Sequence, residues 1–270
     1  MSPELHFLFS LALRMAVSAA FVVGASIITE RAGPAIGALV ATLPVSAGPA
    51  YLFLALDHDD AFIAQSALAS LPMNAASVLM MAVIVLMAQR FSMPASLGAG
   101  LALWLFFAEL VRLFDWAFSA GIVLNVAALG IALRLVQPFR AARMPLITRR
   151  WYDIPVRAAL VAIVVAMVVT LSDALGPRVG GAIALFPVVT SSLVLILMPR
   201  IGGKPTAALL ANSQWGMIGF AFAVMVIHLA AAPLGRATAL CLALATGVGW
   251  NIGLWLYERA KNRAQGLSGA

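Results

Sequence analysis

Two arginines stand inside long apolar stretches, and their chemistry needs the most explanation. Arg14 lies deep in a stretch that starts near Leu5, and Arg157 follows Asp153 at the start of another. An arginine at the centre of a membrane helix costs about 2.5–3.5 kcal/mol on insertion scales, so each needs a compensating partner. The planar guanidinium suits a carboxylate or phosphate. Either the pair binds an anionic solute, or each arginine stabilises a helix end or the backbone in its own half.

Acidic side chains that could neutralise Arg14 are few. Glu109 has Arg112 as a nearer partner on the same predicted helix. The aspartates that come into question fall in predicted loops, namely Asp57, Asp59, Asp60 and Asp173. We therefore predict that Arg14 contacts either a cluster of backbone carbonyls or a solute anion.

Two prolines interrupt apolar stretches at corresponding positions. A proline inside a helix lacks an N–H and frees backbone carbonyls of the preceding turn, which hydroxyl groups or a solute can engage. Hydroxyl side chains flank Pro44 and Pro187, namely Thr42, Ser46, Thr190 and Ser191. These residues either form a solute site near the centre of the membrane or belong to kinked packing helices whose hydroxyls bond to their own backbone.

Further polar residues lie in other predicted spans. Asn212 and Gln214 either line the same site or form interhelical hydrogen bonds. His228 and Glu109 are candidate proton carriers, because proton coupling needs a titratable group in the path. Glu109 has a structural alternative, which is an ion pair with Arg112 at the outer end of its helix.

The composition excludes a water-soluble fold. Hydrophobic residues make up 63% of the chain and charged residues 10%, whereas soluble domains carry about 25% charged residues. The formal net charge of +7 comes from basic residues in short loops, so it predicts membrane topology rather than nucleic-acid binding. The single cysteine, Cys241, precludes a disulfide within the chain. We predict no metal site, no cofactor and no catalytic residue.

Hydropathy predicts an all-α polytopic membrane protein with about nine spans. The spans cover residues 5–29, 34–56, 61–89, 94–112, 116–136, 153–172, 178–199, 205–232 and 237–257. The start of the third span, through about Leu71, is expected at the membrane interface before Pro72. With the N-terminus outside, only Arg112, Arg178 and Arg236 lie among the outer loops. The positive-inside rule therefore predicts an outer N-terminus and a cytoplasmic C-terminus.

The sequence repeats itself at a fixed offset. Shifting it by 143 residues superposes Arg14 on Arg157 and Pro44 on Pro187 without a gap. An odd number of predicted spans separates equivalent positions, so the two halves cross the membrane in opposite directions. We predict a first repeat of four helices over 1–113, a linker helix and basic loop over 114–147, and an inverted second repeat over 148–270. Interruptions at equivalent positions of inverted repeats are typical of transporter sites.

The second half also carries a recognisable pattern. It reads GGAIALFPVVTSSL from Gly180, then ALLANSQWGMIGFAF, and it ends its last span with Gly249-Trp250-Asn251. This resembles the GlpM-like inner-membrane proteins, whose pattern runs Gly, apolar residues, Phe-Pro-Thr, a loop, Ser-x-Trp and a Gly-rich last helix. In the first half Leu43-Pro44-Val45-Ser46 stands for the Phe-Pro segment, and no tryptophan matches Trp215. The resemblance implies two such four-helix units fused through a linker helix, and it implies no particular substrate.

The function that we expect is secondary transport of a small solute, with an anion as the charge type that the arginines would favour. The alternative is a membrane scaffold or accessory protein of an envelope pathway, with the basic loop from Arg140 to Tyr152 as its contact surface. An enzyme is disfavoured because no nucleophile and base can be paired. The expected partners are the lipid bilayer and the solute, with no nucleic acid, and the expected location is a bacterial inner membrane. No pattern predicts an oligomeric state.

Overall fold

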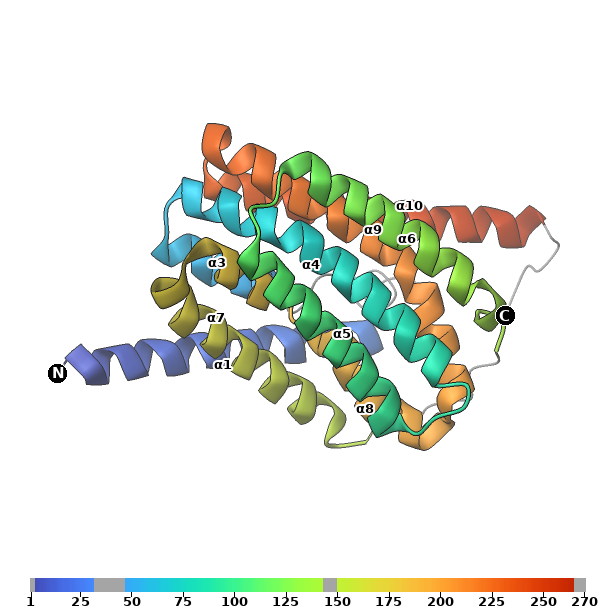
Figure 1. The fold of residues 1–270 in the computed structure, drawn as a ribbon. Helices are drawn as coiled ribbons and strands as arrows, with labels where there is room; N and C mark the ends of the chain where they lie inside the picture. The colour runs from blue at the N-terminus through green and yellow to red at the C-terminus, as the bar shows by residue number, and fades with distance from the viewer. Residues whose placement is uncertain (1–2, 32–46, 143–149, 265–270) are drawn as a thin grey trace.

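The computed structural model describes residues 3–31, 47–142 and 150–264. Every regular element in these ranges is a helix (Figure 1). The helices are α1 (Pro3–Arg31), α3 (Ala47–Asp57), α4 (Asp60–Met87), α5 (Met93–Leu113), α6 (Phe118–Val136), the short 3₁₀ helix η1 (Gln137–Phe139), α7 (Asp153–Ala184), α8 (Val188–Ile201), α9 (Gly203–Leu234) and α10 (Arg236–Ala264).

Several of these helices suit a bilayer. Six are long and apolar enough to cross a membrane, or seven if one bent pair is taken as a single span. The coarse prediction of an all-α membrane protein is therefore confirmed over the described ranges. Outer helices expose large apolar side chains such as Phe9, Leu105 and Leu256, as expected of a surface that faces lipid. The predicted span over 34–56 lies mostly outside the described residues, which resume at Ala47.

The centre of the fold is the pair of helices α4 and α9. Near the start of α4, the carbonyl oxygen of Ala64 lies 2.8 Å from Nδ1 of His228, late in α9. Further along α4, the carbonyl of Val78 accepts a hydrogen bond of 3.3 Å from the side-chain amide of Gln214, early in α9. Contacts that advance along α4 thus retreat along α9, and the two helices run antiparallel.

The first part of α4 is an internal part of this pair. The helix runs without interruption from Asp60 to Met87 with Pro72 inside it, and Ile63 and Leu71 are fully buried. The expectation that this start lies at the membrane interface is wrong. The proline there favoured a boundary, but packing against the neighbouring helices keeps the segment helical and enclosed.

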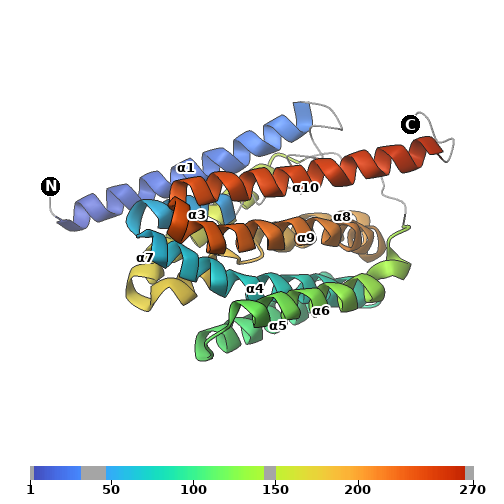
Figure 2. The same ribbon diagram turned by 90° about the horizontal axis from the view of Figure 1, so that it is seen from above.

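The remaining helices surround this pair. Figure 2 shows α5 and α6 on one side of it and α10 on the other, next to α9. Asn125 fixes α6 to α4, because its amide donates 2.7 Å to the carbonyl of Leu71 and 2.8 Å to that of Gly121. Helix α1 packs along α7. The predicted linker helix is therefore an integral part of the bundle.

The chain bends twice between α7 and α8. Gly176 adopts φ 80° and ψ −177°, a conformation that favours glycine, and it kinks α7. The helical segment that follows, Ala174–Ala184, meets α8 at 43°. Pro187 has φ −78° and ψ 58°, and Val188 N–H donates 2.7 Å to the Phe186 carbonyl, which together make an inverse γ-turn. The predicted interruption at Pro187 is present, whereas Thr42, Pro44 and Ser46 lie outside the described residues.

Candidate functional site

A cavity of about 190 Å³ lies beside the break between α7 and α8. Its walls come from α4, α8, α9 and α10, with Ala47 at the start of α3. The described residues that line it are Ala47, Ser77, Met81, Leu185, Phe186, Pro187, Val189, Thr190, Leu193, Leu210, Ser213, Gly216, Met217, Phe220, Ala223, Gly247 and Asn251. Most of this lining is apolar, and none of these residues is charged.

The polar groups in the wall are mostly engaged with the protein. Ser77 Oγ donates 3.0 Å to the Met73 carbonyl and accepts 3.1 Å from Nε1 of Trp104. Ser213 Oγ donates 2.9 Å to the Leu209 carbonyl of its own helix. The hydroxyl protons of both serines are therefore in use, and their oxygens retain capacity to accept a further hydrogen bond.

The first turn of α8 adds backbone donors to the wall. The first hydrogen bond of this helix runs from Ser191 N–H to the Pro187 carbonyl at 2.9 Å, so the N–H groups of Val189 and Thr190 precede the regular ladder. No side chain caps this end, and both residues line the cavity. The cavity thus combines an apolar wall, hydroxyl acceptors and a helix N-terminus with its positive dipole end.

Buried hydrogen bonds hold the helical segment before the break in place. Tyr51 of α3 and Ser70 of α4 share a hydrogen bond of 2.6 Å, and Ser70 Oγ donates 2.8 Å to the Gly181 carbonyl. A Cβ at Gly181 would overlap the backbone of Ser66, so α7 and α4 approach each other here at glycine distance. This contact positions Phe186 and Pro187 at the cavity.

The residues predicted from the sequence fall into different places around this cavity. Pro187 and Thr190 line it. Ser191 is buried within α8, and Gln214 is fully buried between α9 and α4, where its amide binds Val78. Asn212 is exposed and accepts 2.9 Å from Nε of Arg140. The interhelical hydrogen-bond alternative thus describes Gln214.

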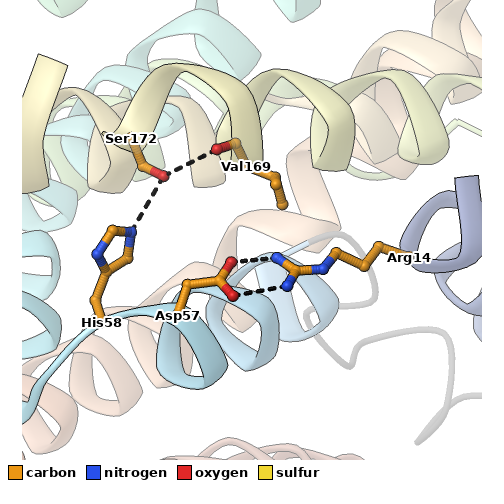
Figure 3. A network of polar contacts seen from close by, with 5 residues as sticks. All are labelled: Arg14, Asp57, His58, Val169 and Ser172. Atoms are coloured by element: carbon orange, nitrogen blue, oxygen red, sulfur yellow. Dashed lines mark hydrogen bonds and ion pairs between the residues drawn. The ribbon is translucent and has the colours of Figure 1, made fainter. Parts of the chain in front are cut away.

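The prediction that Arg14 finds no acidic side chain is wrong. Its guanidinium pairs with the carboxylate of Asp57, and Nη2 donates 2.6 Å to Oδ1 (Figure 3). The reason is that α3 continues through Asp57 instead of ending before it, which turns the carboxylate toward α1. Beside it, His58 Nε2 lies 3.4 Å from Ser172 Oγ of α7. Arg14 is not among the residues that line the cavity.

Arg157 also lies away from the cavity lining, one turn after Asp153 on α7. The carboxylate of Asp153 binds Arg200 of α8 at 2.5 and 3.0 Å, with both side chains largely buried. The adjacent Tyr152 accepts hydrogen bonds from Arg200 and Arg150, which lower the pKa of its hydroxyl. Basic and acidic groups therefore neutralise one another at this end of α7.

Neither candidate proton carrier lines the cavity. Glu109 Oε2 accepts 2.9 Å from Nε of Arg112, and both side chains are more than half exposed, so the ion pair expected as the structural alternative is confirmed. His228 lies between α9 and α4, with its ring centroid 4.9 Å from that of Phe118. Within the described part of the chain, no three His, Cys, Asp or Glu side chains gather as metal ligands.

Two cavity residues were not predicted from the sequence. Asn251 is buried on α10, and it is the one asparagine in an otherwise apolar span, which is a usable signal. Ser77 offered no signal, because serines are common in the apolar stretches and only the packing selects this one. No protein-family model, no curated protein and no solved structure matches the chain. The site therefore has to be interpreted from its own geometry.

Proposed function

We propose that this protein is a membrane permease for a small solute, and that the cavity beside Pro187 is the binding site. The observation that supports the proposal is a cavity at a break in an otherwise spanning helix pair. Broken helices expose backbone groups at membrane depth only where they line a cavity or are buried in protein. A bend of 43° is far short of a reversal, which favours a broken span over a re-entrant loop.

We further propose that two inverted repeats build this permease, over residues 1–113 and 148–270, with α6 in the linker between them. The offset of 143 residues carries the start of α4 at Asp60 to the start of α9 at Gly203, and the start of α5 at Met93 to that of α10 at Arg236. Equivalent helices thus begin at equivalent residues, which supports a duplication of the element order.

The contact between α4 and α9 supports an axis between the repeats. Asn74 donates a hydrogen bond of 3.4 Å to the carbonyl of Met217, which is the residue exactly 143 positions later. A residue that touches its own equivalent lies next to a two-fold axis. Because α4 and α9 are antiparallel, such an axis runs across the helices and so in the membrane plane, as in transporters with inverted repeats.

The distribution of charge supports an orientation. The ends of α4, α6, α8 and α10 and the start of α9 carry basic residues, namely Arg90, Arg134, Arg200, Lys204, Arg259, Lys261 and Arg263. The opposite end carries Asp57, Asp59, Asp60 and Asp115. By the positive-inside rule the basic end is cytoplasmic, which puts the N-terminus outside and the C-terminus inside a bacterial inner membrane.

Uptake into proteoliposomes tests the permease. A panel of small neutral and charged solutes, with and without a pH gradient, is compared for the wild type, Gly216→Leu and Gly130→Leu. Gly216 faces the cavity and a Cβ there meets nothing closer than 3.9 Å, whereas Gly130 is an exposed glycine of α6 with open space around it. Both leucines should therefore be tolerated by the fold.

We expect uptake in the wild type and in Gly130→Leu and its loss in Gly216→Leu, with similar melting temperatures for all three. Equal uptake in both variants would show that solute does not pass the cavity. If no solute enters with any of the three proteins, the alternative of a non-transporting scaffold or accessory protein takes precedence.

A further inference from the structure

The cavity itself narrows the class of solute, on the premise that it is the permease site. An apolar cavity of about 150 Å³ accepts benzene, so about 190 Å³ accommodates a molecule of one ring or a comparable branched chain. Phe186, Met217 and Phe220 supply the apolar contact surface. The size and the wall together favour a compact, largely apolar molecule.

Charge complementarity argues against an ion in this space. The described lining contains no charged side chain, and moving an unpaired ion into a low-dielectric environment costs many kcal/mol. Arg14 would be the natural counter-charge for an anion, but Asp57 pairs with it. The Asp153 carboxylate, which would suit a cation, pairs with Arg200.

The hydrogen-bonding groups of the wall favour one polar group on the solute. The N–H groups of Val189 and Thr190 at the start of α8 can donate to an oxygen, and the positive end of the helix dipole favours its partial negative charge. The oxygens of Ser77 and Ser213 have already given up their protons to backbone carbonyls, so they can accept a proton from the solute. A hydroxyl group meets both requirements, because it donates one hydrogen bond and accepts others.

We propose that the cavity binds a small uncharged molecule with an apolar body and a single hydroxyl or primary amide group. Four probes of nearly equal size separate this class from its neighbours: benzyl alcohol, benzoate, benzylammonium and toluene. Binding is measured by calorimetry to the purified full-length protein in lipid nanodiscs at neutral pH. Gly216→Leu, with its cavity filled, reports the partition of each probe into lipid.

We expect cavity-dependent binding of benzyl alcohol that is at least about tenfold tighter than that of benzoate or benzylammonium, a difference of about 1.4 kcal/mol. Toluene should also bind less tightly than benzyl alcohol, and Thr190→Val, which keeps the size of the side chain, should leave the preference for neutral probes intact. Tighter binding of benzoate or benzylammonium would overturn the proposal, as would equal heats for all probes in the wild type and Gly216→Leu.

Failure here differs from failure of the permease function. If benzyl alcohol binds in the cavity but no solute crosses proteoliposomes, the inference on the ligand class holds and transport is wrong. If charged solutes are taken up through the cavity and Gly216→Leu blocks them, transport holds and the ligand class is wrong.

Discussion

Two helix pairs at opposite ends of α4 and α9 are each joined by an aspartate and an arginine, with the residues exchanged. In the first half, Arg14 of α1 binds Asp57 at the last residue of α3. In the second half, Asp153 of α7 binds Arg200 near the end of α8. The offset of 143 residues carries Asp57 to Arg200, so one structural position bears opposite charges in the two halves.

The exchange indicates which property each position requires. Both pairs tie a helix end to the helix before it, so the link is kept while the sign of the charge is not. If the halves are inverted, one helix end lies outside and the other at the cytoplasmic face, where arginine is favoured. The pairs also differ in exposure: the side chains are 20% and 28% exposed for Arg14 and Asp57, and 12% and 13% for Arg200 and Asp153.

The largest effect is expected from breaking the more buried pair. Asp153→Asn leaves the buried charge of Arg200 without its partner, which should lower the free energy of unfolding by about 3 kcal/mol. Asp57→Asn leaves a more exposed arginine, so it should cost about 1 kcal/mol. Unfolding of the purified variants in detergent, followed by circular dichroism, measures both.

A double variant checks the physical reason. Adding Arg200→Met to Asp153→Asn removes the unpaired charge and should recover most of the lost stability, since apolar replacements of buried ion pairs are often neutral. Equal losses for Asp153→Asn and Asp57→Asn, or no recovery in the double variant, would show that exposure does not decide the difference between the halves.

A second comparison uses two serines at equivalent positions, Ser70 and Ser213. Ser70 is fully buried and links Tyr51 to the carbonyl of Gly181. Removing its hydroxyl in Ser70→Ala leaves two buried polar groups without a partner, and we expect a loss of about 1–3 kcal/mol. Ser213 bonds to its own helix and is exposed, so Ser213→Ala should change stability by less than about 0.5 kcal/mol. Comparable losses in the same detergent assay would contradict the anchoring role of Ser70.

The smallest effect is expected at Glu109. Its ion pair with Arg112 is exposed, with side-chain exposures of 64% and 58%, and such pairs contribute about 0–1 kcal/mol. Glu109→Gln should leave stability and uptake in proteoliposomes nearly unchanged at every pH. An altered dependence of uptake on the pH gradient would restore Glu109 as a proton carrier.

Local sequence features predicted the helices and the break well. Long apolar runs leave a membrane chain little choice but helix, and Pro187 marks the break because its ring cannot continue the ladder. The partner of Arg14 could not be predicted, since it depended on whether α3 reaches Asp57 and how α1 packs on α7. For the same reason the cavity wall could not be assembled: Ser77 and Asn251 meet only through the packing of α4, α9 and α10.

The inverted arrangement of the two halves is tested most directly by labelling the equivalent ends of α4 and α9. In a background with Cys241→Ala, which removes the only cysteine, single cysteines are introduced as Asp59→Cys and Lys204→Cys. A membrane-impermeant thiol reagent is added to intact cells and, separately, to permeabilised cells. The residue before α4 should react in intact cells, and the residue at the start of α9 only after permeabilisation. Reaction of both in intact cells, or of neither before permeabilisation, would contradict the opposite orientation of the halves.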